Sequence, residues 1–594
     1  MSDAPSAGPI HRPLVKIDGT KLAPEVVDCL LDCRVDLAVG RSGQAVLRFL
    51  DQAFHLLDSA LLTVGKGITI SLANSSNELK PTFDGELLSV GIETGPNDEP
   101  IVTITAFDKS HRLARNSVSM VHTNRKYSDL VTKIAGDAGM QHDVATTTTV
   151  FPYLLQTTNG ATLLNDIAER TGMVWWVEGK KLIMKKPVTA AAATVTLERG
   201  KALRRVRALS SAGTVSDQVT VRSWDPTSKA VIVGESTTKP AALSSTSLVS
   251  GTRTGAGTFA TSKRTTTTRP SLSADEATAV ATSMHQRTIS DELNVRADSE
   301  GNADIKVGGT VELKGLGTRI SGRYFVTAVE HVYSLNDYRT KFTSAGTTPS
   351  TLVDLLGSGG SVPWHRMGPV AGVVSELGGK DFPGLVKVKL SALGENVVTN
   401  WARVMAPGAG ATRGSLMMPS IHDEVLVMFE DGDVRRPVVI GALWNGKDKQ
   451  PVGTVEDGKV VSWVTKSNSG HTLTFNDGQA DDKKSVIIAL SDQTVKLNLG
   501  MDKVELFAKN DTPLQLKSNQ ATITITAKGD IEIKGTNIKL TADKDVEITG
   551  ANVKITGNSS AVMKGNSSVE VSGAMAKIAG QSMTEIKGGI VKIN

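Results

Sequence analysis

Few residues of the chain have the types and spacing that chemistry requires. The two cysteines, Cys29 and Cys33, stand four positions apart, and no second Cys or His pair accompanies them. A structural zinc site needs four such ligands, so we expect small core or surface positions and neither a metal site nor a disulfide framework. So few cysteines are typical of a protein that assembles in a reducing cytoplasm.

One segment imitates a nucleotide-binding motif. Residues 441–447, Gly-Ala-Leu-Trp-Asn-Gly-Lys, have the glycine and lysine spacing of a phosphate-binding loop. Asp448 replaces the Ser or Thr of that loop, and Pro451 follows where a helix should begin. The signatures HExxH and GxSxG do not occur, and the acidic pair Asp481 and Asp482 lies in an expected solvated turn. We therefore expect no catalytic residue, no cofactor and no metal, and not an enzyme.

Composition predicts a large, mainly β protein. A chain of 594 residues is longer than one hydrophobic core normally supports, so we expect three or more domains. Aromatic residues make up only 4% and glycine reaches 56 residues, which favours strands joined by many turns. The 66 basic and 61 acidic residues nearly balance, so nucleic acid is not an indicated partner. The N-terminal segment lacks a secretion signal, and no apolar run is long enough for a membrane span.

Apolar periodicity divides the chain into strand-rich and helical segments. Short strands separated by turns dominate residues 14–107 and return at 304–342, and five strands at 370–444 predict a closed barrel of the OB type. The helical period and an exposed Ser/Thr-rich stretch appear between them. The predicted helices are 127–139, 161–171 and 275–286, and the predicted loop is 243–269.

From about residue 460 the sequence repeats. Apolar pairs two residues apart recur in steps of seven or eight, from Ile523/Ile525 to Val591/Ile593, with glycines between most of them. Earlier pairs, such as Leu514/Leu516, are spaced more widely. Each pair predicts a very short strand with two inward side chains and charged neighbours outside. Such a strand buries too little surface alone, so the repeats must stack on one another or on other chains.

Periodicity leaves two architectures open. One is a single-chain β-helix with three strands per coil, and the other is a prism in which three chains intertwine. An ordinary β-sandwich is disfavoured, because its strands are longer and less regular.

Several motifs carry a family resemblance. Between residues 401 and 446 the segments WARVMAPGAG, GSLMMPSI, DEVLV and RPVVIGALWNG follow one another. This region closely resembles the VgrG-type spike proteins of type VI secretion, contractile phage tails and extracellular contractile injection particles. The segments 106–115, 324–331 and 469–475 extend the likeness. One departure is His422, where the family usually has glycine, and a non-glycine residue disfavours positive φ there.

The resemblance implies a fold and its boundaries. We expect a mainly β homotrimer with an N-terminal hub of two β-barrels with helical insertions, an OB-fold barrel, and a C-terminal triple-stranded intertwined β-helix, or needle. The predicted segments are a flexible arm (1–13), the hub (14–355), a Gly/Ser linker (356–362), the OB-fold domain (363–452) and the needle (453–594).

The resemblance also implies a role and partners. The chain would be the membrane-puncturing central spike of a contractile injection system. Its hub would bind a hexameric tube or tube-initiator protein and baseplate components, and the spike would connect them to the tip. It would contact the target envelope transiently. It would assemble in the cytoplasm without a signal peptide, as part of a contractile particle. Release of that particle outside the cell stays open from the sequence. No histidine follows His471, so we expect a PAAR-type protein, not a metal, at the tip. The residues predicted to contact it are Ile590, Val591, Lys592, Ile593 and Asn594.

Two other functions stay open from the sequence. One is a carbohydrate-active enzyme or adhesin on a single-chain β-helix. The other is an OB-fold nucleic-acid binder, for which the basic patch and the stacking aromatic residues are missing.

Overall fold

A computed structural model of the chain divides into two compact units, residues 1–448 and 449–594. The predicted linker at 356–362 and most of the predicted arm at 1–13 lie outside the residues that the structure describes. No helix within the described residues is long and apolar enough to cross a membrane. The described residues are 12–94, 99–189, 192–213, 215–238, 243–249, 259, 261–267, 270–335, 337–345, 368–509 and 511–593.

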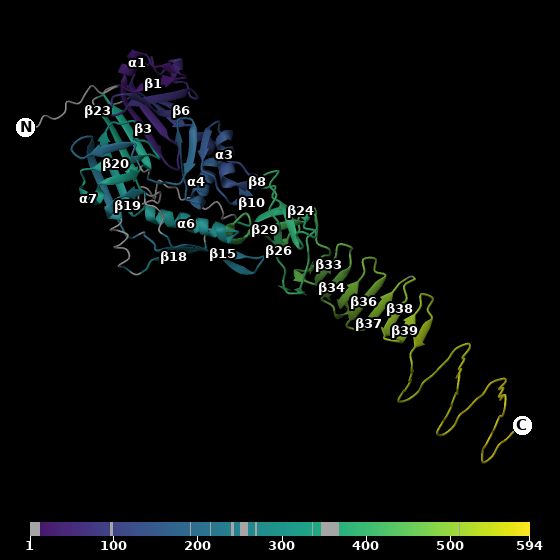
Figure 1. Ribbon diagram of the computed structural model, residues 1–594. Helices are drawn as coiled ribbons and strands as arrows, with labels where there is room; N and C mark the ends of the chain where they lie inside the picture. Colours follow the sequence, from purple (N-terminus) through teal and green to yellow (C-terminus); the bar gives the residue numbers. More distant parts are fainter. Residues whose placement is uncertain are drawn as a thin grey trace, which may run out of the picture. The chain divides into compact units, whose positions relative to one another are not determined.

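One antiparallel sheet of eleven strands organises the hub (Figure 1). Two of its neighbouring strands, β3 and β22, come from opposite ends of the hub sequence, and all of β22 pairs with residues 32–38 of β3. The sheet therefore joins both halves of the hub. In order across the sheet the strands are β14 (Leu203–Ser210), β19 (Leu293–Glu300), β23 (Asp337–Ser344), β22 (Ala328–Ser334), β3 (Leu30–Ala38), β4 (Gln44–Leu50), β7 (Pro100–Asp108), β6 (Leu79–Thr94), β5 (Gly67–Ala73), β1 (Leu14–Ile17) and β2 (Thr20–Lys21).

This sheet covers two separate cores. In β4 the side chains of Ala45, Leu47 and Phe49 are buried while their neighbours are partly exposed, as strand alternation requires. They belong to the first core, whereas Val295 and Phe342 belong to the second. The hub thus has two cores, and its described strands form one eleven-stranded sheet with smaller sheets beside it.

A helical insertion with its own core lies between the two halves. Helix α4 begins where the Asn159 side chain accepts a hydrogen bond from the Thr162 backbone N–H, and it ends at Gly172 with φ 70°. Both helices predicted from periodicity here are present. The elements of the insertion are α2 (His111–Arg115), β8 (Met120–Lys126), α3 (Tyr127–Asp137), β9 (Gln141–Val144), β10 (Val150–Gln156), α4 (Gly160–Thr171), β11 (Val174–Glu178) and β12 (Lys181–Lys185).

Strand β11 is shared by two cores. Its adjacent tryptophans point to opposite faces, so Trp175 packs in the core of the insertion and Trp176 in the second hub core. The Trp175 indole N–H donates to Asn165 at 2.7 Å. The Trp176 indole N–H is buried without a hydrogen-bond acceptor among the described residues.

The third predicted helix, α6 (Ala274–Ser290), packs on a sheet of three strands, β16 (Ala230–Ser236), β15 (Gln218–Asp225) and β18 (Lys263–Thr266). A Cβ atom at Gly234 would lie 2.1 Å from the Ala277 backbone, so only glycine permits this close approach. The prediction of a loop over 243–269 was incomplete, because β18 forms there through parallel pairing with β15.

Short elements complete the hub. Among the described residues they include one further sheet, two small helices and a 3-10 turn. The sheet contains β13 (Val195–Glu198), β20 (Thr310–Lys314), β21 (Gly322–Phe325) and β17 (Ser244–Ser245), and the other elements are α1 (Pro24–Asp28), α7 (Gly317–Ile320) and η1 (Ala60–Leu62).

Five strands close into the predicted OB-type barrel. A hairpin, β27 (Ala409–Gly410) with β28 (Arg413–Gly414), and the turn η2 (Glu430–Gly432) extend from it. His422 adopts φ 78°, so the turn keeps the left-handed conformation despite the absence of glycine. The barrel strands are β24 (Val370–Leu377), β25 (Leu385–Lys389), β26 (Ala402–Val404), β30 (Pro437–Ala442) and β29 (Glu424–Phe429).

The second unit begins as antiparallel sheets in which consecutive strands pair. After the hairpin β31 (Val455–Glu456) and β32 (Lys459–Val460), five strands form one sheet and three form another. The first sheet contains β33 (Ser462–Lys466), β34 (Thr472–Asp477), β35 (Lys484–Ala489), β36 (Val495–Gly500) and β37 (Val504–Ala508), with η3 (Asp481–Lys483) between two of them, and the second contains β38 (Leu514–Ser518), β39 (Ala521–Ile525) and β40 (Ile531–Lys534).

Candidate functional site

The five-stranded sheet of the second unit has one apolar face. Cross-strand partners share a face of a sheet, and the register aligns one apolar residue from every strand in a single row. A second row beside it is apolar except at Thr465. The first row is Trp463, Phe475, Val486, Leu499 and Val504, and the second is Thr465, Leu473, Ile488, Leu497 and Leu506.

This face is not covered by any described part of the second unit. Trp463 is 68% exposed and Val504 is 72% exposed. Monomeric soluble proteins rarely leave a contiguous apolar surface of this kind in water. The face therefore has the character of an interface.

The three-stranded sheet continues the pattern. Ile525 pairs with both Leu514 and Ile531, and Ile523 pairs with both Leu516 and Ile533, which makes two rows of three apolar residues. Ile531 is 67% exposed. The opposite face carries polar and charged residues, including Lys517, Thr522, Glu532 and Lys534.

The register differs from that of a single-chain β-helix. A β-helix with three strands per coil pairs each strand in parallel with the strand one coil away. Strands β33 to β37 and β38 to β40 instead pair antiparallel with their sequence neighbours. Over residues 462–534 the single-chain alternative from the sequence is therefore wrong.

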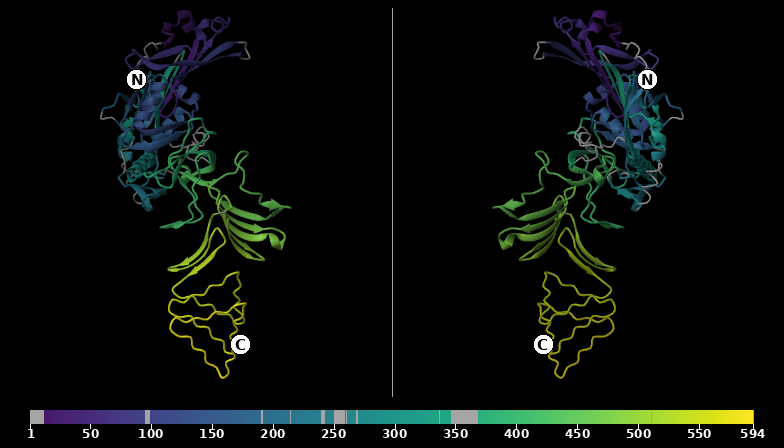
Figure 2. Two further views of the ribbon diagram at one scale, coloured as in Figure 1. Left: turned by 90° about the vertical axis from the view of Figure 1, so that its right-hand side faces the viewer. Right: turned by 90° about the vertical axis from the view of Figure 1, so that its left-hand side faces the viewer.

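Beyond β40 the described chain runs as a zigzag without strand pairing (Figure 2). Its bends repeat every seven or eight residues and fall at or just after a glycine in every case but one. The exception is the bend at Asp543 and Lys544. Between the bends lie the predicted apolar pairs, which are all exposed. The bends are at 536, 543–544, 551–552, 558–559, 566–567, 573–574, 581–582 and 589–590.

The predicted tip residues lie at the end of this zigzag. Ile590, Val591, Lys592 and Ile593 are exposed, and Ile593 is 86% exposed. Asn594 lies outside the described residues. The tip thus presents several apolar side chains within the last repeat.

A buried ion network fastens the OB barrel to the hub. Arg435, in the turn before β30, contacts Glu276 of α6 at 2.8 Å and Asp433 at 2.8 Å. Glu276 also contacts Arg170 of α4 at 3.4 Å, and Arg170 pairs with Asp166. Arg435 is only 3% exposed. These charges come from three elements far apart in the sequence, so they form only when the barrel lies against the helices.

Burial alone would raise the pKa of the Glu276 carboxyl, but Arg435 and Arg170 outweigh it and hold the pKa below its ordinary value. The network therefore stays charged at neutral pH. The adjacent Arg436 donates to the backbone carbonyls of Trp224 and Ser271, both at 2.6 Å.

A second contact joins the barrel to the insertion. Tyr153 and Leu155 of β10 pack into the barrel core, and the Tyr153 hydroxyl donates to the Val398 carbonyl at 2.9 Å. Phe151 and Leu154 of the same strand pack into the core of the insertion. Sequence reasoning missed both contacts between the barrel and the rest of the hub. The one sequence signal, the Arg435–Arg436 pair, belongs to the ion network and not to the Tyr153 contact.

Family comparisons agree with this architecture. Residues 10–334, more than half of the chain, match the Alg8 N-terminal domain. The chain belongs to the Alg8 N-terminal domain family. The description of that family names a domain and no reaction. Residues 370–444 match the type VI secretion system/phage-baseplate injector OB domain, which coincides with the closed barrel.

Curated relatives confirm the resemblance to VgrG-type spike proteins. The type VI secretion system spike protein VgrG1a of Pseudomonas aeruginosa is 33% identical over 85 residues, which cover 14% of this chain and 13% of that protein. VgrG2a of the same organism is 33% identical over 91 residues, 15% of this chain and 11% of that protein. The chain thus matches about an eighth of the length of these relatives.

A solved structure resembles most of the chain. A chain of the Francisella PdpA–VgrG complex superposes with a TM-score of 0.50 and covers 88% of this chain and 87% of its own length. The identity is 8%, so this likeness shows the fold alone.

In this Alg8-family chain, the residues whose types could have served catalysis or ligand binding have structural roles. Burial raises the pKa of the Cys33 thiol to about 12, so the thiol stays protonated, and Cys29 donates to the Glu25 carbonyl. In the segment that imitates a phosphate-binding loop, Asn445 Oδ1 accepts hydrogen bonds from the backbone N–H groups of Lys447 and Asp448. Those N–H groups are therefore already occupied.

The acidic pair lies in the exposed turn η3, where Asp481 pairs with Lys484 at 2.6 Å. Within the described ranges no three His, Cys, Asp or Glu side chains come together in a way that could hold a metal ion.

One pair resembles a nucleophile with its base. Ser236 Oγ lies 2.9 Å from His285 Nδ1, and His285 Nε2 lies 2.9 Å from the Ser216 carbonyl oxygen. Because a carbonyl only accepts, Nε2 carries the proton and Nδ1 accepts from Ser236. Both side chains are buried between β16 and α6, so the pair stabilises the packing of the helix on the sheet. No sequence motif indicated this Ser236–His285 pair.

Proposed function

We propose that the chain is the central spike of a contractile injection system: a structural, membrane-puncturing protein that acts as a homotrimer. The observation that carries this proposal is the exposed apolar face of the second unit, which continues from β33 into the repeats beyond β40. The spike-protein relatives and the baseplate-injector OB domain support it.

The occupant of the apolar face, on this proposal, is two further copies of the same chain. Three chains winding together bury the apolar pairs along the axis and leave charged residues such as Glu532 outside. Each fully buried Val, Leu or Ile contributes about 1.5–3 kcal/mol. Hydrogen bonds between chains replace the strand pairing that the zigzag lacks within one chain.

The test is the solution mass of the full-length protein by light scattering, repeated in mild detergent without boiling. We expect a stable species of three times the 62.7 kDa chain. A monomer with the repeats protected from proteolysis would contradict the trimer, because one chain would then cover its own apolar face.

We infer that the hub receives a hexameric tube or tube-initiator protein and baseplate components, and that the spike meets the target envelope only transiently. On this proposal assembly takes place in the cytoplasm. Co-purification of the tube partner with particles released from the cells would assign the finished particle to the extracellular kind. The two-core hub supports this proposal, because three copies with two cores each would present six units to a sixfold tube.

We further propose that a PAAR-type protein caps the tip through Ile590, Val591, Lys592, Ile593 and Asn594. Their support is the exposed apolar end of the last described repeat. The test compares capture of the cap protein by the full chain and by a chain truncated after Gly580. Equal capture by both would overturn this assignment.

We infer that the chain converts no substrate. The structural roles of Cys33, Asn445 and His285 support this inference, as do relatives named as spike proteins. Nothing in the site favours the carbohydrate-active enzyme or adhesin.

A further inference from the structure

A groove of about 470 Å³ lies between helix α1 and the segment 50–61 in the first half of the hub. Apolar side chains dominate the lining of this α1 groove, among them Val26 of the helix and Leu56 and Leu61 of the segment. Phe54, in the same segment, is 42% exposed. Ligand-binding clefts typically measure about 300–1,000 Å³, so the groove is large enough to take in a side chain of a partner.

The fold holds the segment beside the groove in a fixed shape. Asp51, which is 7% exposed, accepts hydrogen bonds from the backbone N–H groups of Leu56 at 3.0 Å and Leu57 at 2.8 Å. Phe54 adopts φ 57° within this turn, a conformation that a bulky side chain rarely takes. Such strain persists only where the surrounding structure determines the conformation, and it clusters at binding sites. The α1 groove is therefore formed before a partner arrives.

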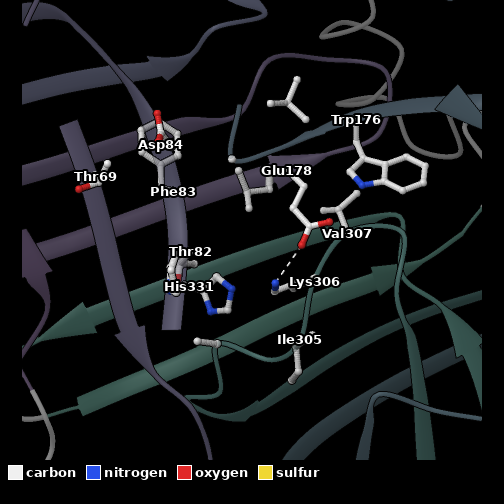
Figure 3. Close-up of a pocket in the computed structure, with 15 residues that line it drawn as sticks. Thr69, Thr82, Phe83, Asp84, Trp176, Glu178, Ile305, Lys306, Val307 and His331 are labelled. Atoms are coloured by element: carbon white, nitrogen blue, oxygen red, sulfur yellow. Dashed lines mark hydrogen bonds and ion pairs between the residues drawn. The ribbon is translucent and has the colours of Figure 1, made fainter. Parts of the chain in front are cut away.

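The charges of the lining are acidic. Among the described residues that line the α1 groove, Glu25 and Asp51 are carboxylates and none is a lysine or arginine. Asp51 is engaged by the backbone, whereas the exposed Glu25 forms no ion pair with another described side chain. The cavity between β6, β11 and the loop 303–307 differs, because Lys306 and Glu178 pair there across 2.9 Å (Figure 3). The α1 groove thus favours an apolar side chain that has a basic neighbour.

The α1 groove lies at one end of the first unit. Its buried lining residue Leu56 belongs to the first hub core, and Figure 1 shows α1 at the end of the hub away from the barrel strands β24 and β29. The chain continues from the barrel into the second unit. The barrel end is therefore taken by the connection to the second unit, and the α1 end is available to a partner that joins the hub from the other side.

We propose that the α1 groove is a docking site for the hexameric tube or tube-initiator protein. An apolar side chain of that protein fills the groove, and a lysine or arginine beside it pairs with Glu25. This inference rests on the proposed spike function and adds the chemistry by which the hub recognises its tube.

The experiment measures binding of the purified tube protein of the same contractile system to the full-length chain by biolayer interferometry. Ala53 is exposed and lines the groove, so we expect Ala53→Trp to fill the space and to lose about tenfold in affinity. The matched control is Ala60→Trp, because Ala60 is exposed in the same segment and is not among the lining residues. This control should bind within about twofold of the wild type, and light scattering should give both variants the wild-type mass.

A second pair of variants tests the charge. Glu25→Lys places a like charge against the expected basic residue, and we expect a loss of about tenfold in affinity that diminishes at high salt. Asp58→Lys makes the same change of charge at an exposed residue outside the lining. It should lose less than about threefold.

Wild-type affinity in either Ala53→Trp or Glu25→Lys would overturn the inference and leave the spike function intact, because the tube would then bind elsewhere on the hub. A loss of trimer mass in Ala53→Trp would also overturn it, since the groove would then face a second copy of the chain. If the trimeric wild type did not bind the tube protein at micromolar concentration, both the inference and the tube partner of the proposed function would be wrong.

Discussion

At the scale of single residues, the decisive contact is the carboxylate of Glu276. It lies between Arg435 of the barrel and Arg170 of the hub, and Leu272 N–H donates to it as well. Removing one partner from a buried network leaves uncompensated charges, which costs about 3–5 kcal/mol. Glu276 thus determines how firmly the barrel is held to the helices.

We predict that Glu276→Ala lowers the unfolding temperature of the hub by on the order of 5–10 °C, measured by differential scanning calorimetry on the full chain. The control is Asp275→Ala. Asp275 is the exposed neighbour in the first turn of α6, and its loss removes only a favourable interaction with the helix dipole. Equal shifts in the two variants would contradict the role of the network.

The same network predicts a pH dependence. Because the pKa of Glu276 in the folded protein lies below its ordinary value, its contribution is complete above about pH 4.3 and is lost as the pH falls toward the folded pKa. Unfolding temperatures from pH 7 to pH 3 for wild type and Glu276→Gln should differ by a constant amount above this value and converge below it. A difference that widens on acidification would contradict the sign.

At the scale of elements, local periodicity was sufficient for the helices. Residues of α4 with apolar spacing, followed by Gly172, predict a helix and its end from a few neighbours. The contact between Glu276 and Arg435 joins residues 159 positions apart, and no local pattern encodes it. Strand β18 was missed for the same reason, since its Ser/Thr-rich sequence forms a strand only through pairing with β15.

The needle shows the converse. Its apolar pairs, such as Ile531 and Ile533, were visible in the sequence because the spacing repeats. The direction in which the strands pair could not be predicted, because two apolar residues per strand fit parallel and antiparallel neighbours equally well. The observed register supplies that information.

We predict that Ile533→Lys disrupts the trimer, whereas Glu532→Lys does not. Ile533 lies in the apolar row with Ile523, and Glu532 lies on the opposite face. The first change removes about 2–3 kcal/mol of burial per chain and adds an unpaired charge. Light scattering and unboiled gels measure the outcome, and a stable trimer of the Ile533 variant would mean that this face points to solvent.

At the scale of the whole molecule, the two units differ in where their cores lie. The first unit has closed cores within one chain, including those around Phe49 and Phe342. In the second unit, the described residues have almost no buried apolar side chain, with Val461 and Ala489 as the exceptions. The first unit therefore has its own cores, and in the proposed trimer the core of the second unit would lie between chains.

This division predicts how the stability of the proposed trimer changes with chain length. A chain ending at Asp448 should fold but lose resistance to detergent, and a chain ending at Lys534, which keeps both antiparallel sheets, should retain part of it. Stability in stacked repeats is roughly the sum of neighbouring interfaces, and chains that are wound together separate slowly. Half-lives of the trimer in detergent at rising temperature measure the series. If the chain ending at Asp448 were as resistant as the full chain, the hub would hold the trimer together, and the apolar rows of the second unit would need another partner.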